Sequence, residues 1–309
     1  MKFNELVEIY LDEPSKKYGR NKRGTSTERH ADLLAKAFGH LDVEAISELD
    51  VRRFFSGGMK SLGWKNNTYM VYRSVYNAMM NFAKEKPPEG LGIITDFPKV
   101  KSRTREKRER YLNQKEITKL LNVVDPLRAD ILRVLFATGL RLNNIVQLRI
   151  DQIIDDGETI RIPGNKTKNN VPIEVPLLPV ARDVIAKRIA MSKALEQERP
   201  NIFKQYNREI EHVFGQIENV SRKYIGLPLR TFHTKKWWAD LESINMKGDF
   251  TPHVCRHTFA SMHVKQGTDL LMLKELGGWE RIESVQRYSH VNTDAKRKAA
   301  AKLRAVMNL

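Results

Sequence analysis

Several side chains able to bind a phosphate or transfer a proton lie close together near the C-terminal end of the chain. They fall within TPHVCRHTFASMHVKQGTDLLMLKELGGWERIESVQRYSHV, residues 251–291. His253 and Arg256 are three positions apart, which places them on one face of a helix. Trp279 and Tyr288 follow, nine residues apart. Arginine offers a permanent charge and a planar fork of donors that suits phosphate, and a tyrosine phenol can act as a covalent nucleophile.

A second arginine suited to an anion lies at the end of an apolar helix. The run 130–138 is rich in Ile, Leu and Val, and Gly139 is placed to end the helix, with Arg141 just beyond it in TGLR. Fixed cations and donors around a phosphorus atom stabilise the charge that develops on its oxygens during in-line attack. Most arginines in a basic chain only form surface ion pairs. The helix end before Arg141, and the apolar segment that holds Arg256 with His253, favour the phosphate role.

This set of residues resembles the catalytic set of the tyrosine recombinases, the phage integrase family. That family uses an Arg, a Lys, a His-x-x-Arg pair, a His or Trp, and a nucleophilic Tyr. The resemblance implies that Tyr288 attacks the DNA backbone and forms a 3′-phosphotyrosine ester, which stores the bond energy without ATP. It also implies that Arg141, Arg256 and Trp279 hold the phosphate. His253 would exchange a proton with the nucleophile or bond a non-bridging oxygen.

The leaving 5′ oxygen needs a proton, and a lysine on a hairpin turn can deliver it if its surroundings lower its pKa. The predicted turn offers Lys166 and Lys168. The family's spacing, counted back from Val175-Pro176-Leu177, places the acid at Lys168. Lys166 is the alternative, and ordinary turn polarity would also explain both lysines.

The chain departs from the family pattern at two positions. Trp279 stands where most members carry histidine, and its indole N–H is a donor only, so it can bond a phosphate oxygen but cannot transfer a proton. Asn144 stands three residues after Arg141, where the family commonly has Glu or Asp, which leaves the orientation of Arg141 open. We interpret the second histidine of the segment, His257, as a core residue without a catalytic role.

The composition is that of a basic protein. Lys and Arg outnumber Asp and Glu by 54 to 37, which gives a formal net charge of +17 and a pI near 9.8. Such an excess is what binding to a phosphate backbone requires, although ribosomal and membrane-surface proteins share it. At 309 residues the chain is long enough for two domains with separate cores.

The sequence carries no sign of a cofactor or a membrane anchor. Cys255 is the single cysteine, which excludes an internal disulfide and a multi-cysteine zinc site. Helical metal signatures and phosphate-binding glycine loops are absent, so we expect neither a metal nor a nucleotide. Without a long apolar run or a signal peptide, the predicted location is the cytoplasm, at the nucleoid when bound to DNA.

Residues 1–98 are predicted to form a helical, SAM-like core DNA-binding domain. Four helices are expected before the stop KPPEG at 86–90, because proline cannot continue a helix. Ser47 and Asp50 predict the start of the third helix, and Asn67 that of the fourth. Residues 99–110, KVKSRTREKRER, hold seven basic and two acidic residues and are predicted to be a basic interdomain linker. The pattern begins almost at Met1, so we expect no additional arm-binding domain.

Residues 111–309 are predicted to form the catalytic domain, which makes the whole fold mainly α with a small antiparallel β-sheet. Asn113 and Glu116 predict a capped helix start. Alternating apolar and polar residues over 160–177 predict a β-hairpin. Further helices are expected at 181–191, 210–224 and 232–241. The tail after Tyr288 is predicted to form a helix that packs on its own domain or, as in the family, on a neighbouring protomer.

The resemblance implies a site-specific DNA recombinase of the integrase type, which integrates or excises a mobile element. Its expected partners are double-stranded DNA with specific recombination sites and other protomers in a synaptic tetramer, which an accessory DNA-bending or directionality factor can join. Two alternatives remain: a type IB topoisomerase with the same chemistry, or a catalytically silent protein that only binds a DNA site. Base contacts depend on which side chains reach the grooves, so the sequence does not give the target site.

Overall fold

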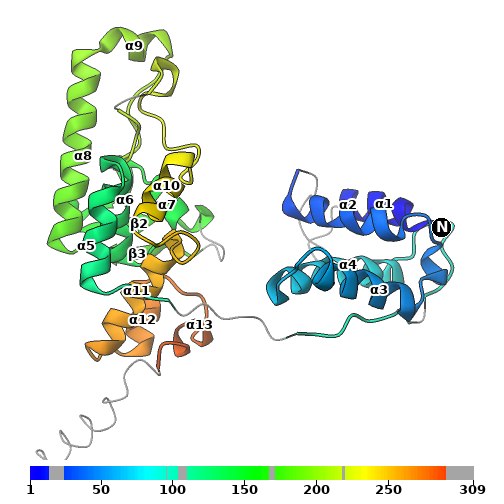
Figure 1. Cartoon of the computed structure of the whole chain (residues 1–309). Coiled ribbons are helices and arrows are strands. Elements are labelled where there is room, and N and C mark those ends of the chain that lie inside the picture. The colour runs from blue at the N-terminus through cyan, green and yellow to red at the C-terminus, as the bar shows by residue number, and fades with distance from the viewer. Residues whose placement is uncertain (14–23, 95, 104–109, 167–170, 218–219, 290–309) are drawn as a thin grey trace, which may run out of the picture. The chain divides into compact units, whose positions relative to one another are not determined.

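The computed structural model describes residues 1–13, 24–94, 96–103, 110–166, 171–217 and 220–289 (Figure 1). The chain divides into two compact units, Met1–Arg108 and Glu109–Leu309. The fold is mainly α-helical with one three-stranded antiparallel sheet, which confirms the predicted fold class. No helix in the described ranges is long and apolar enough to cross a membrane.

The described residues of the first unit form a bundle of four helices. They are α1 (Phe3–Asp12), α2 (Ser26–Phe38), α3 (Glu48–Lys60) and α4 (Asn66–Glu85). Helices α1 and α2 lie together over α3 and α4, with α4 in contact with all three others (Figure 1). Their apolar stripes meet in one core rich in aromatic rings, in which Phe3, Phe38 and Tyr76 pack against one another.

Helix starts in this unit follow local side-chain caps. The Ser47 hydroxyl accepts the Asp50 N–H at 3.2 Å, and the Asp50 carboxylate accepts the Ser47 N–H at 3.0 Å, so the predicted start of α3 is confirmed. Helix α4 begins one residue before the expected Asn67, with Lys65 as its N-cap.

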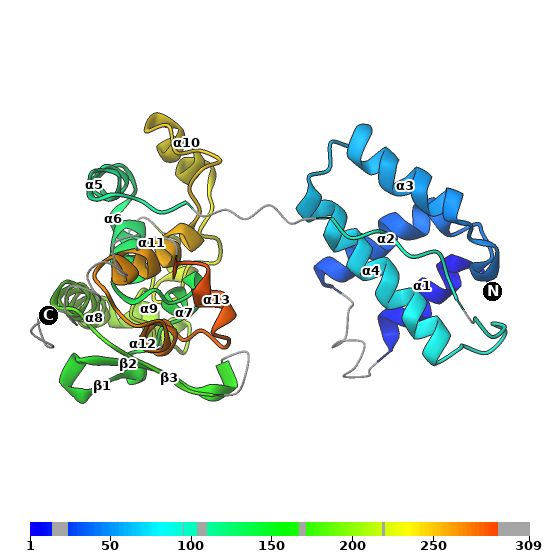
Figure 2. The ribbon, with the colours of Figure 1, turned by 90° about the horizontal axis from the view of Figure 1, so that it is seen from below.

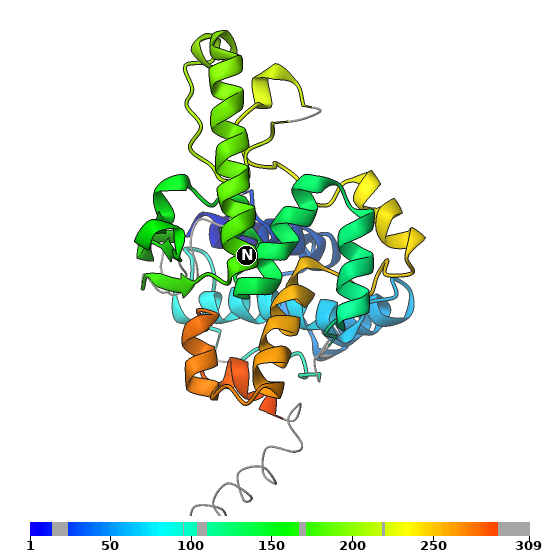
Figure 3. The same ribbon diagram turned by 90° about the vertical axis from the view of Figure 1, so that its left-hand side faces the viewer.

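The second unit is built around α6 (Pro126–Thr138), which packs against α5 (Gln114–Val123), α8 (Pro179–Glu198) and α11 (Pro252–Lys265). Helix α8 extends beyond the body of this unit and carries α9 (Pro200–Gln205) at its far end (Figure 3). The shorter helices of the unit are α7 (Leu142–Val146), α10 (Lys235–Ser243), α12 (Leu270–Leu276) and α13 (Glu283–Gln286).

The sheet contains the predicted hairpin and one additional strand. Strands β2 (Thr159–Ile162) and β3 (Ile173–Pro176) pair antiparallel, with Ile160 opposite Val175, which confirms the hairpin. The short β1 (Ile153–Ile154) pairs with β2 on the other side. The sheet lies beside α12, which contacts β3 (Figure 2).

The predicted helix over 210–224 is wrong. In the described part of this segment, only Arg222–Tyr224 forms a short 3-10 turn, and the remaining described residues run as extended and turning chain. Two backbone groups near the start of this segment pair with 148–150: the Ile150 N–H donates to Glu211 O, and the Val213 N–H donates to Leu148 O, both at 2.9 Å. Val213 and Phe214 are fully buried in the core of the second unit. These apolar residues are therefore buried on an irregular segment and not on the face of a helix.

The start of another helix also differs from the predicted one. Helix α6 begins at Pro126 rather than at residue 130, because Asp125 caps it by accepting the Arg128 N–H at 3.1 Å. The predicted tail helix lies outside the described residues.

Candidate functional site

Arg256 lies at the centre of a buried cluster in the second unit. Its side chain belongs to α11 and is only 3% exposed. Its Nη1 donates to the carbonyl oxygens of Gly139 at 2.6 Å and of Gly277 at 2.5 Å. The guanidinium carbon lies 3.6 Å from the centroid of the Trp279 ring, a close cation–π contact. One guanidinium therefore joins the end of α6, the end of α12 and the indole.

Two glycines allow the carbonyls to approach the guanidinium this closely. Gly139 ends α6 with φ of +64°, and a Cβ there would lie 2.4 Å from a ring atom of Phe259. At Gly277 a Cβ would lie 1.8 Å from the ring of Trp279. A side chain at either position would displace the ring that shapes the cluster.

The electrostatics of the cluster favour an anion. Burial, with a smaller contribution from the positive charge of Arg141, lowers the pKa of Arg256 to about 9. Arg256 is therefore still protonated at neutral pH. Its Nη2 is buried and has no hydrogen-bond partner among the described residues. Arg141 is exposed at the start of α7 and forms no ion pair within the same ranges. Two guanidinium groups without a protein carboxylate would be stabilised by a bound anion such as a phosphate.

Tyr288 follows α13, and its hydroxyl points at a histidine. The residue is 6% exposed, and its hydroxyl oxygen lies 2.6 Å from Nδ1 of His257. Burial is the main cause that lowers the pKa of His257 to about 4, with smaller effects of nearby positive groups. The imidazole is therefore neutral at physiological pH, and the phenol donates to Nδ1 when the ring hydrogen is on Nε2. The Trp279 ring lies on Tyr288 edge to face, at 6.3 Å between centroids.

His253 lies in the first turn of α11, at the surface. Its ring meets the ring of His257 edge to face, with 4.7 Å between centroids. Burial lowers its pKa, and the positive charges of Arg256 and Arg141 lower it further. A neutral His253 beside two arginines can accept a proton or a hydrogen bond.

The side chains of the two candidate lysines are not among those that the structure describes. Lys168 lies outside the described residues, as does the side chain of Lys166, so the choice between them stays a prediction. The chain that follows this segment borders the cluster: a cleft of about 360 Å³ is lined by Val171, Arg141 and Trp279, among others.

The structure thus brings five of the six predicted site residues into one region of the second unit, and it adds one. Arg141, His253, Arg256, Trp279 and Tyr288 come from the α6–α7 junction, α11 and the chain around α12 and α13. The added residue is His257, which we predicted from the sequence to be a core residue. A sequence signal did exist, since His257 lies four residues after His253 and so on the same helix face. No three His, Cys, Asp or Glu side chains of the described ranges cluster closely enough to hold a metal.

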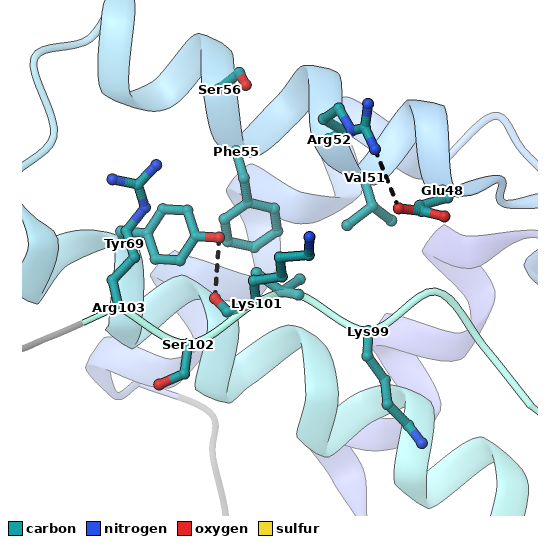
Figure 4. Close-up of a pocket in the computed structure, with 11 residues that line it drawn as sticks. Glu48, Val51, Arg52, Phe55, Ser56, Tyr69, Lys99, Lys101, Ser102 and Arg103 are labelled. Carbon is teal, nitrogen blue, oxygen red and sulfur yellow. Dashed lines mark hydrogen bonds and ion pairs between the residues drawn. The ribbon is translucent and has the colours of Figure 1, made fainter.

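The first unit has a basic hollow of its own, between α3 and residues 99–103 (Figure 4). The Tyr69 hydroxyl donates to Lys101 O at 3.1 Å, and the Arg103 guanidinium lies 4.9 Å from the Tyr69 ring centroid. Figure 4 shows Lys101 reaching toward α3, where Arg52 also borders the hollow. This surface offers several cations next to an aromatic ring.

Comparison with known proteins gives consistent matches. A family model described as the phage integrase family matches residues 110–295. The integrase of Salmonella phage P22 is 30% identical over 187 residues, which are 60% of this chain and 45% of that protein. The tyrosine recombinase XerD of Lacticaseibacillus casei is 28% identical over 52% of this chain and 50% of its own length. The chain thus spans about half the length of these two relatives. XerD of Pasteurella multocida is 26% identical over 94% of this chain and 95% of its own length.

Solved structures show the same fold. The Tn1549 transposon integrase, in complex with transposon right end DNA, matches with a TM-score of 0.69 at 16% identity, over 98% of this chain and 99% of that one. The XerH site-specific recombinase, bound to a palindromic difH substrate, matches with a TM-score of 0.62 at 18% identity, over 89% and 76%. The family match covers more than half of the sequence, including every candidate site residue. The chain belongs to the phage integrase family.

Proposed function

We propose that this protein is a site-specific DNA recombinase that cuts and rejoins DNA through a 3′-phosphotyrosine intermediate on Tyr288. The observation that carries the proposal is the buried guanidinium of Arg256. It is held by two backbone carbonyls and an indole, and its Nη2 has no partner among the described residues. A second cation, Arg141, lies near enough to lower its pKa. This arrangement suits a phosphodiester whose charge must be stabilised during attack.

In the proposed cleavage step, the Tyr288 oxygen attacks the scissile phosphorus in line. A bond forms between phosphorus and the phenol oxygen, and the bond from phosphorus to the 5′ oxygen breaks. The phenol proton passes to His253, and the leaving 5′ oxygen takes a proton from Lys168. Rejoining is the reverse, with a 5′ hydroxyl of another strand attacking the phosphotyrosine, so the ester bond supplies the energy.

The phosphate is held by three groups in this proposal. Arg256 and Arg141 supply positive charge to the non-bridging oxygens, and the indole N–H of Trp279 donates a hydrogen bond. Trp279 also fixes the plane of the Arg256 guanidinium, since the two groups stack at 3.6 Å.

The partner of the protein is double-stranded DNA, and the protein acts at the nucleoid. The net charge of +17 and the basic hollow of the first unit support binding to the phosphate backbone. The relatives include a phage integrase, and a transposon integrase of similar fold was solved with transposon DNA. We infer a role in integrating or excising a mobile element, with four protomers acting on two duplexes.

The test is covalent trapping on a nicked suicide duplex made from repeats that flank the gene. A protein–DNA adduct should form with EDTA present, carry a 3′ linkage, and be lost in Tyr288→Phe, which retains the ring. An intact fold with DNA binding but no adduct would refute the proposal and leave a protein that only binds a site. Relaxation of a supercoiled plasmid without exchange of partners would instead indicate a topoisomerase.

A further inference from the structure

We propose that His257 is a positioning residue for the nucleophile: its Nδ1 holds the Tyr288 hydroxyl in the place from which it attacks. This inference rests on the proposed function. It is carried by the contact of 2.6 Å between the hydroxyl oxygen and Nδ1, which joins residues 31 positions apart in the sequence.

The hydroxyl contact with His257 gives the Tyr288 side chain a direction that its apolar surroundings do not give. The tyrosine ring packs in a small apolar cluster with Val285, Leu273 and Phe259, among others. The His257 ring approaches it at 5.7 Å between centroids, tilted by 57°. Apolar packing is non-directional, so it restricts the position of the ring but does not orient an O–H bond. A hydrogen bond does, because its strength falls steeply away from linearity.

The position that His257 selects is beside the phosphate cluster. His257 follows Arg256 directly in α11, and the Tyr288 hydroxyl is close enough to raise the pKa of Arg256. Trp279 contacts both the guanidinium and the tyrosine ring. The histidine therefore keeps the attacking oxygen near the guanidinium that binds the phosphate.

Proton acceptance by His257 is a poor alternative to positioning. A free phenol has a pKa of about 10, whereas the pKa of His257 is lowered to about 4. Transfer of a proton from such a phenol to this imidazole is unfavourable by a factor of roughly a million. The ring can hold the hydrogen without removing it.

The test compares two substitutions with a matched control. His257→Phe keeps an aromatic ring but removes the acceptor, and His257→Asn returns an amide oxygen near the place of Nδ1. The control is His263→Phe: His263 is also in α11, and its Nδ1 bonds a hydroxyl, that of Thr268 at 3.0 Å. Adduct formation on the nicked suicide duplex is followed in a single turnover with saturating protein, beside DNA affinity and melting temperature.

The maximal rate constant of adduct formation should fall roughly 10- to 100-fold in His257→Phe, because a misplaced attacking atom costs about this much. DNA affinity should not change, and His257→Asn should recover most of the rate. His263→Phe should retain the wild-type rate. A purely structural role would instead lower the fraction of active protein, seen as the amplitude, at an unchanged rate constant.

The inference is overturned if His257→Phe reacts at the wild-type rate, or if His257→Asn is no faster than His257→Phe at equal melting temperature. Failure of the proposed function looks different. In that case the wild-type protein itself forms no adduct that depends on Tyr288.

Discussion

Replacing Arg256 by lysine should make the rate of strand cleavage depend on pH in a range where the rate of the wild-type protein does not. Burial lowers the pKa of Arg256 by more than three units to about 9, so the arginine stays charged at neutral pH. The same fall from the ordinary lysine pKa of about 10.4 gives a value of about 7. The lysine of Arg256→Lys would therefore lose its charge as the pH rises through neutrality.

The expected magnitudes follow from the contacts of the guanidinium. An ammonium cannot bond both carbonyls, stack on Trp279 and still face a phosphate, so the rate at pH 6 should already fall by about 100- to 1,000-fold. Above pH 7 it should fall by about a further tenfold per pH unit, as the neutral form takes over.

Stability should change with pH in the opposite direction. The folded pKa of the lysine lies below its unfolded value, so the unfolded chain binds more protons between pH 7 and 10. The free energy of unfolding of Arg256→Lys should therefore rise by up to about 1.4 kcal/mol per pH unit over this range, while its activity falls. A decline of both together would indicate unfolding rather than loss of charge.

The assay is single-turnover adduct formation on the nicked duplex from pH 6 to 9, with urea denaturation at each pH. Arg141→Lys is the matched control: position 141 is exposed, so water can hydrate the ammonium and no additional pH step is expected. The reasoning is refuted if Arg256→Lys and the wild-type protein show parallel rate and stability profiles over this range.

Two further predictions concern folding and DNA affinity. Asp130→Ala should lower the free energy of unfolding, measured in urea, by roughly 3–5 kcal/mol. It removes the carboxylate that accepts the Arg188 Nε–H at 2.7 Å, and both side chains are only 3% exposed. The double variant with Arg188→Met should recover much of this loss, and an absence of recovery would contradict the account. Lys101→Gln in the basic hollow should weaken binding about equally on specific and random duplexes and reduce the slope of log K against log salt by about 0.9, measured by fluorescence anisotropy. An unchanged slope would exclude a phosphate contact by Lys101.

Features set by neighbouring residues could be predicted from the sequence. The Asn113 side chain accepts the Glu116 N–H at 3.0 Å, and the Glu116 carboxylate accepts the Asn113 N–H at 2.8 Å, so the whole signal for this helix start lies within four residues. Gly139 ends α6 for a similar reason, since its positive φ favours a residue without a side chain. The alternation in β2 and β3 likewise predicted the hairpin.

Features set by distant partners could not be predicted in this way. The segment over 210–224 has apolar residues at helical spacing, yet its backbone pairs with 148–150, some 60 residues earlier, and no local pattern encodes that pairing. The contact of His257 with Tyr288 similarly depends on how α11 and α13 meet. For the site, the residue types and spacings indicated which side chains belong together. They did not indicate that Arg256 would be buried with its charge held by two carbonyls.

The adjacent glycines 277 and 278 lie between the hairpin and the phosphate cluster. A Cβ on Gly277 would lie 1.8 Å from the Trp279 ring, and a Cβ on Gly278 would lie 2.7 Å from the side chain of Ile173 in β3. A methyl group at 277 would therefore press on the indole that stacks on Arg256, and one at 278 would press on the strand. The sheet and the phosphate cluster thus meet at two neighbouring residues that have no room for a side chain.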